Sequence, residues 1–85
     1  MALNTVYPNP FNPTTSISYT LSDMDHIALS VYNLTGQLIE TLVNDQQGAG
    51  SYSLIWDASQ LPSGMYFLRM ETSTEMFHQK LMLLK

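Results

Sequence analysis

The chain has 85 residues, of which 45% are hydrophobic and 12% are charged, and its formal net charge is −4 at pH 7. A chain of this length forms one small domain and buries only about 60–65% of the surface that its unfolded form exposes, which leaves little room for an enclosed catalytic cleft. Only three basic residues oppose seven acidic ones, whereas nucleic-acid binding needs clustered Lys and Arg. The composition therefore excludes a nucleic-acid-binding role, and its apolar share excludes a charge-driven disordered tail.

The chain contains no cysteine, so disulfides, thiolate zinc ligands and thiol nucleophiles are excluded. No apolar run approaches the roughly 20 residues of a membrane-spanning helix. The first residues lack the basic and apolar regions of a signal peptide. We interpret Met1-Ala2 as an expression start, and we expect the domain to come from a longer protein whose targeting signal lies elsewhere.

Three of the four prolines lie in residues 7–14, which read YPNPFNPT. Each proline fixes its own φ and disfavours helical backbone in the residue before it, so this stretch is predicted to be an extended, turn-prone lead-in. We expect Tyr7 and Phe11 to hold it against a sheet. Residues 1–6 are interpreted as an expression start or linker remnant, and residues 7–85 as the domain.

From residue 16 onward, apolar and polar residues alternate with a period of two, which is typical of half-buried strands. Strands are predicted over residues 16–21, 27–32, 37–43, 51–56, 65–71 and 75–84. Polar turns separate them, and Gly36 in one of these turns suits a positive φ. Six or seven short strands of this kind predict a single all-β domain, an immunoglobulin-like or fibronectin type III-like antiparallel sandwich of about seven strands.

Two details of this pattern are less regular. Both faces of residues 37–43 are largely apolar, and we expect Ile39, Thr41 and Val43 to face inward. Residues 58–61 are the only stretch that could form a single helical turn, with Asp57 as its N-cap.

Residue types that could carry chemistry are sparse. His26 and His78 are the only imidazoles, and because zinc needs three or four protein ligands, both are interpreted as ordinary strand residues. The carboxylates of residues 23–25 and Asp45 lack the spacing of a calcium loop, and no serine lies on a nucleophile elbow. We therefore predict no catalytic residue, no metal site and no cofactor.

The aromatic residues and the last strand each allow two interpretations. Tyr52, Trp56, Tyr66 and Phe67 could stack on a sugar, but Tyr52 and Trp56 share a parity with Leu54, which favours core packing. The last strand becomes apolar on both faces toward its end. It is either buried between neighbouring strands or a handle that pairs with a strand of another protein.

Several motifs follow one another along nearly the whole chain. They are YPNPFNPTT (residues 7–15), I-x-Y-x-L (17–21), LSVYNLTG (29–36), AG-x-Y-x-x-x-WD (49–57), L-x-SGMYF (61–67) and KLMLLK (80–85). In this order, they resemble the C-terminal sorting domain of cargo proteins of the type IX (Por) secretion system. Part of the set is also similar to the immunoglobulin-like domain of flagellar hook-capping proteins.

The resemblance implies a non-enzymatic domain that directs a larger cargo protein through the outer-membrane translocon of Bacteroidetes-like bacteria. The cargo would cross the periplasm and reach the cell surface or the medium, and a sortase-type peptidase would remove the domain. By resemblance, the residues recognised by translocon and peptidase are Pro8, Asn9, Pro10, Gly36, Gly64, Tyr66, Lys80 and Lys85. The residue after Gly36 is often basic in the family, and Gln37 stands there in this chain.

Two other functions remain open at this point. One is a non-catalytic accessory sandwich, structural or carbohydrate-binding, that is appended to a secreted enzyme. The other is an assembly domain of the hook-capping type. Sandwich folds host many unrelated functions, so the fold alone does not distinguish them.

Overall fold

The computed structural model describes the backbone of residues 2–7 and all atoms of residues 13–84. Within these ranges the chain forms strands and no α-helix, and thus no helix that could span a membrane. The seven strands are β1 (Ala2–Tyr7), β2 (Thr14–Leu21), β3 (Asp25–Asn33), β4 (Leu38–Gln47), β5 (Gly50–Asp57), β6 (Gly64–Glu71) and β7 (Met76–Leu83).

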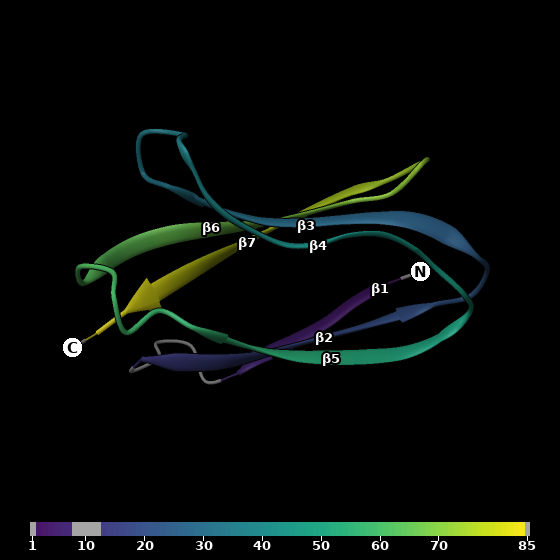
Figure 1. The fold of residues 1–85 in the computed structure, drawn as a ribbon, viewed down its shortest axis with the longest axis horizontal. Coiled ribbons are helices and arrows are strands. Elements are labelled where there is room, and N and C mark those ends of the chain that lie inside the picture. Colours follow the sequence, from purple (N-terminus) through teal and green to yellow (C-terminus); the bar gives the residue numbers. More distant parts are fainter. Residues whose placement is uncertain (1, 8–12, 85) are drawn as a thin grey trace.

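The strands form two antiparallel sheets that face each other (Figure 1). One sheet has the order β1-β2-β5 and the other the order β4-β3-β6-β7. The chain crosses between the sheets after β2, after β4 and after β5. This arrangement confirms the predicted seven-stranded antiparallel sandwich.

Alternate residues of the central strands fill the space between the sheets. The half-buried character predicted from the period-two alternation is confirmed in β2, β3 and β6, because every second side chain of their central parts is buried. Each fully buried aliphatic side chain contributes about 1.5–3 kcal/mol through removal of apolar surface from water. The buried apolar residues are Ile17, Tyr19, Leu21, Ile27, Leu29, Val31, Trp56, Ala58, Tyr66, Leu68, Met70, Leu81 and Leu83.

Two aromatic side chains of the three-stranded sheet make hydrogen bonds to β4 on the opposite sheet. The Tyr19 hydroxyl donates to Gln47 Oε1 at 2.5 Å, and Trp56 Nε1 donates to Glu40 Oε1 at 3.2 Å. Burial raises the pKa of Tyr19 above its ordinary value, because the charged phenolate would lose its hydration. These bonds satisfy the polar atoms of buried rings and join the two sheets along one side.

The inward set predicted for β4 is wrong for Thr41, which is exposed, whereas Ile39 and Val43 pack against the core. The cause lies in the register of β4 against β3, which skips Leu42 and then Ile39. Each skipped residue is a β-bulge, and each bulge reverses which parity faces inward. As a result Leu42, which lies on the other predicted face, also packs against the core.

Both ends of the chain form edge strands in the described part. β1 was not predicted from the sequence, and it pairs with β2 from Ala2 opposite Thr20 to Tyr7 opposite Ser16. β7 pairs with β6 alone among the described strands. Of the two interpretations of the last strand, the described residues therefore favour an edge strand over one enclosed by neighbours.

We expect Leu68→Ala to lower the free energy of unfolding by about 2–5 kcal/mol, because it leaves a cavity in the centre of the core. Leu68 has no exposed surface, whereas Ile55 on β5 is 73% exposed and provides a matched control. Ile55→Ala is expected to change stability by no more than about 0.5 kcal/mol. Urea unfolding of both variants measures the difference, and equal losses would contradict the placement of the core.

Candidate docking site

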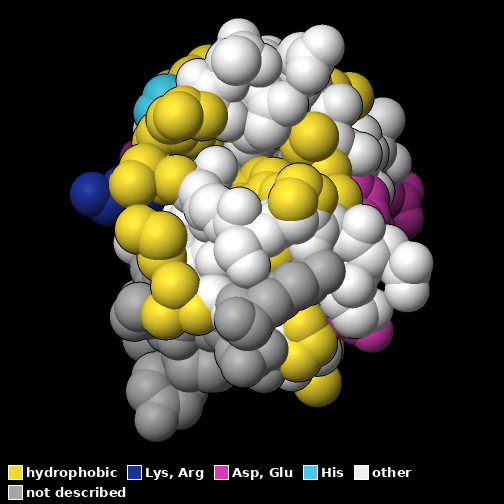
Figure 2. Space-filling view, turned by 90° about the vertical axis from the view of Figure 1, so that its left-hand side faces the viewer, with side chains coloured by type: hydrophobic (Ala, Val, Ile, Leu, Met, Phe, Trp, Pro, Cys, Tyr) yellow, Lys and Arg dark blue, Asp and Glu magenta, His cyan; other side chains and the backbone are white. Residues whose placement is uncertain are grey.

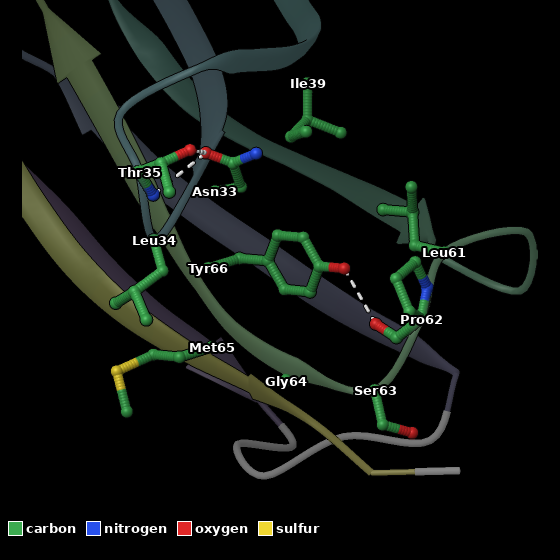
Figure 3. Close-up of a pocket in the computed structure, with 10 residues that line it drawn as sticks. All are labelled: Asn33, Leu34, Thr35, Ile39, Leu61, Pro62, Ser63, Gly64, Met65 and Tyr66. Atoms are coloured by element: carbon green, nitrogen blue, oxygen red, sulfur yellow. Dashed lines mark hydrogen bonds between the residues drawn. The ribbon is translucent and has the colours of Figure 1, made fainter.

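Two connections meet at the left-hand end of the sandwich in Figure 1: the β3–β4 turn and the β5–β6 connection. A hollow of about 340 Å³ lies between them. Most of its lining is apolar side chain and backbone (Figure 3). The lining residues are Asn33, Leu34, Thr35, Ile39, Leu61, Pro62, Ser63, Gly64, Met65 and Tyr66.

The β3–β4 turn is organised by the side chain of Asn33. Its Oδ1 accepts hydrogen bonds from the backbone N–H groups of Thr35 at 3.1 Å and Gln37 at 2.9 Å, and its Nδ2 donates to Gln37 Oε1 at 2.9 Å. Gly36 takes a φ of +88°, which confirms the predicted positive φ. An Asn that bonds the backbone two residues ahead is a common turn device, and here it leaves Leu34 70% exposed at the tip.

Gln37, which stands where the resemblance led us to expect a basic residue, has a local structural role. Its side-chain oxygen accepts from Asn33, and its backbone oxygen accepts from the Asn33 N–H at 3.0 Å. A lysine or arginine side chain has no acceptor atom and cannot replace the first of these bonds. The turn in this chain is thus closed by neutral hydrogen bonds.

The β5–β6 connection starts with a turn held by Asp57. Asp57 Oδ1 accepts from the Ser59 backbone N–H at 2.8 Å, and the Leu61 N–H donates to the Ala58 carbonyl at 3.0 Å. The predicted turn with Asp57 as its cap is present, but residues 58–61 form a hydrogen-bonded turn and not the helical turn that was expected. The hydrogen bonds from Ser59 lower the pKa of Asp57 below its ordinary value, because they stabilise the ionised carboxylate.

Tyr66 holds the other end of this connection. Its ring is 5% exposed and meets the Trp56 ring edge to face at a centroid distance of 6.1 Å. Its hydroxyl donates to the Pro62 carbonyl at 2.7 Å, and Figure 3 shows the ring pointing toward Pro62. Tyr66 thus anchors β6 in the core, and its hydroxyl has a hydrogen-bond partner. Gly64 between them takes a φ of +151°.

Three residues predicted for recognition come together at this end. Gly64 and Tyr66 line the hollow, and Gly36 lies in the turn beside it. Lys80 lies apart, on β7 opposite Phe67. Pro8, Asn9, Pro10 and Lys85 fall outside the described residues. For all eight, a role in recognition stays a prediction.

The apolar lining was not identified from the sequence. Leu34 and Leu61 are apolar residues in otherwise polar connections. An apolar side chain in a polar connection is the sequence signal that could have identified them as part of a surface site. Figure 2, which looks onto this end, shows hydrophobic side chains spread across it. Basic and histidine side chains (dark blue and cyan) lie at one side of this view, and most of the acidic side chains (magenta) lie at the opposite side.

The chemistry of this end suits docking. Its lining offers apolar side chains, backbone groups and hydroxyls. Across residues 2–7 and 13–84, no group of three or more His, Cys, Asp or Glu side chains could hold a metal ion. His26, at the start of β3, makes a 2.8 Å hydrogen bond with Asn44 Oδ1 of the neighbouring strand β4, so it belongs to the strand surface as predicted.

A family model described as "secretion system C-terminal sorting domain" matches residues 5–84. The chain belongs to this family. It is therefore a C-terminal sorting signal for type IX secretion, part of secreted cargo that this system exports to the cell surface or medium. A search of curated proteins finds no significant match. The family match confirms the resemblance drawn from the ordered motifs.

We expect Gly36→Ala to destabilise the sorting domain by about 1–2 kcal/mol, because an L-residue in left-handed backbone brings its Cβ close to the next carbonyl. No heavy atom lies within 4 Å of the Cβ position at either Gly36 or Gly48, so crowding affects neither. Gly48 lacks the positive φ and is the matched control. Thermal unfolding should show a loss for Gly36→Ala alone, and equal losses would contradict the turn geometry.

The pKa of Asp57 predicts a pH-dependent contribution to stability. Because its pKa is lowered in the folded state, the stabilisation is present above the unfolded-state pKa and is lost as the pH falls through the folded-state pKa. We expect the gap in melting temperature between the parent domain and Asp57→Ala to be largest near pH 7 and to shrink in acid. A gap that is constant with pH would show that the carboxylate charge does not matter.

Proposed function

We propose that this domain carries a covalently attached, N-terminal cargo through the type IX outer-membrane translocon, and that the secretion machinery reads the end formed by residues 33–37 and 57–66. The family match over residues 5–84 is the observation that carries the proposal. The apolar hollow at this end, held by the Asn33 turn and the Tyr66–Pro62 bond, supports its use as a docking surface.

The direction of the chain supports this assignment. β1 starts at the right-hand end in Figure 1, whereas the hollow lies at the left-hand end, and the molecule is 37 Å long. A cargo attached ahead of β1 would enter at the far end of the sandwich. The docking end would then stay accessible while the cargo is still attached.

We further propose that the domain is a substrate of a sortase-type peptidase, which removes it after passage through the periplasm and outer membrane. Sorting-signal domains are generally non-catalytic, which fits a substrate role. Peptidases cut most readily in exposed segments whose backbone is not hydrogen-bonded. Because β1 pairs with β2 over Ala2–Tyr7, we place the cut ahead of β1.

A carbohydrate-binding accessory role has less support. Trp56 is 2% exposed and Tyr66 is 5% exposed, and both rings are packed in the core. They are therefore unable to offer flat faces to a sugar. Of the four aromatic residues considered for such a platform, these two are excluded by burial.

The sorting role is tested by fusing the domain behind a signal peptide and a fluorescent reporter in a type IX-competent bacterium and in its translocon-null counterpart. We expect reporter on the surface or in the medium of the competent strain alone. Retention in the periplasm of both strains, with the domain folded, would favour an accessory role. Truncation of residues 80–85 is a poor test, because it removes the buried Leu81 and Leu83 and so disturbs the core.

The docking end is tested by a matched pair of substitutions. Leu34→Gln changes a side chain that is 70% exposed beside the hollow, and Ile55→Gln changes one that is 73% exposed on β5. Both should leave stability within about 0.5 kcal/mol. We expect export of the reporter to fall several-fold for Leu34→Gln alone. Unchanged export, or an equal fall for both variants, would show that the docking surface does not lie at this end.

A further inference from the structure

The outer face of the four-stranded sheet carries a second hollow, of about 320 Å³. Its lining includes Tyr32, Asn33, Leu34, Phe67, Arg69 and His78. We propose that this hollow binds an acidic side chain, Asp or Glu, which a protein partner presents between apolar residues. The partner's place in secretion rests on the function proposed above, but the chemistry of the hollow does not.

The strand register sets two rows of side chains beside each other on this face. One row runs from Ser30 through Arg69 to His78, and the next from Tyr32 through Phe67 to Lys80. They face away from the core, since the alternate residues of β6 are buried. Cationic groups are thus placed next to aromatic rings.

Arg69 has hydrogen-bonding capacity that the described residues leave unused. Its Nε is buried and has no hydrogen-bond partner among them, and Nη2 contacts Glu71 Oε1 at a long 3.3 Å. The guanidinium carbon lies 5.7 Å from the centroid of the Tyr32 ring. Because a buried unpaired donor is costly and a guanidinium matches a carboxylate with two parallel bonds, a carboxylate from outside would be stabilised here.

The charge distribution selects the same kind of ligand. The chain has a net charge of −4, yet Arg69 and Lys80, two of its three basic residues, lie on this one face. Charge complementarity favours an acidic partner at such a face. A nucleic acid would need a larger cluster of basic residues, whereas the single arginine that lines the hollow suits a single carboxylate.

The surroundings of Arg69 indicate a protein partner. Tyr32, Phe67 and Leu34 form apolar walls, and Met65 lies opposite Met82 further along the face. Aromatic residues, Met and Arg are the types that protein interfaces favour. The hollow is at the small end of the usual range for ligand pockets, about 300–1,000 Å³, and so suits one side chain.

Glu71 makes the proposal testable in both directions. It is the carboxylate that now contacts Arg69, and its side chain is 46% exposed. An exposed ion pair of this kind is weak, so an incoming carboxylate can displace it. Removing the Glu71 charge should therefore improve binding, while removing the Arg69 charge should abolish it.

The binding test uses nuclear magnetic resonance, because Arg69 is the only arginine in the chain and gives a single Nε–H signal. The ¹⁵N-labelled domain is titrated with the blocked peptide acetyl-Leu-Glu-Leu-amide, with its Gln counterpart, and with inorganic phosphate. We expect the Glu peptide to shift the Arg69 Nε–H signal in a saturable way and the Gln peptide not to shift it. Equal shifts with the Gln peptide, tighter binding of phosphate, or no shift at all would each overturn the proposal.

Three variants test the assignment of the charges. Arg69→Met keeps the apolar stem of the side chain and should weaken binding of the Glu peptide by about tenfold or more. Arg69→Lys keeps the charge without the planar fork and should weaken it less. Glu71→Gln should strengthen binding by up to about fivefold. Glu75→Gln makes the same change of net charge in the exposed β6–β7 turn and should have no effect; an equal gain from it would refute a local role for Glu71.

The reporter fusion separates this proposal from the proposed function. Export of the unmodified fusion in the competent strain alone reports the sorting role. We expect Arg69→Met to reduce export several-fold while the purified domain stays folded. Full export with Arg69→Met would overturn the use of this hollow in secretion while leaving the sorting role intact.

Discussion

The contact between Trp56 and Tyr66 is the interaction on which the rest of the structure depends. Trp56 belongs to β5 of one sheet and Tyr66 to β6 of the other, and their rings meet edge to face in the core. Trp56 also donates a hydrogen bond to Glu40 on β4, and Tyr66 donates one to the Pro62 carbonyl in the β5–β6 connection. The same pair therefore joins the sheets and fixes the loop that forms the docking end. Without disulfides, no covalent link could replace it.

The sequence predicted the sandwich because the period-two alternation is strong in β2, β3 and β6, where one face of each strand is buried. It predicted the positive φ of Gly36 because a glycine in a turn is a local signal that does not depend on contacts between strands. The resemblance to the family was recognised from several motifs in a fixed order along the chain, and no single strand would have been enough to identify it.

Other features depend on contacts between strands and could not be read from the pattern. The two bulges of β4 are set by its pairing with β3, so the exposure of Thr41 has no signal in residues 37–43. β1 is a short edge strand, and its sequence lacks the alternation that buried strands carry. The two hollows draw on strands and turns far apart in the chain, so their residues share no motif.

The two hollows are parts of one continuous surface, because Asn33 and Leu34 line both of them. They differ in what they can contribute to binding. The apolar hollow at the end of the sandwich can bury apolar surface of a partner, which adds affinity but does not fix the partner's orientation. The hollow at Arg69 offers a planar, charged group that accepts a carboxylate in few orientations. A partner that spans the Asn33 turn would thus be held by one hollow and oriented by the other.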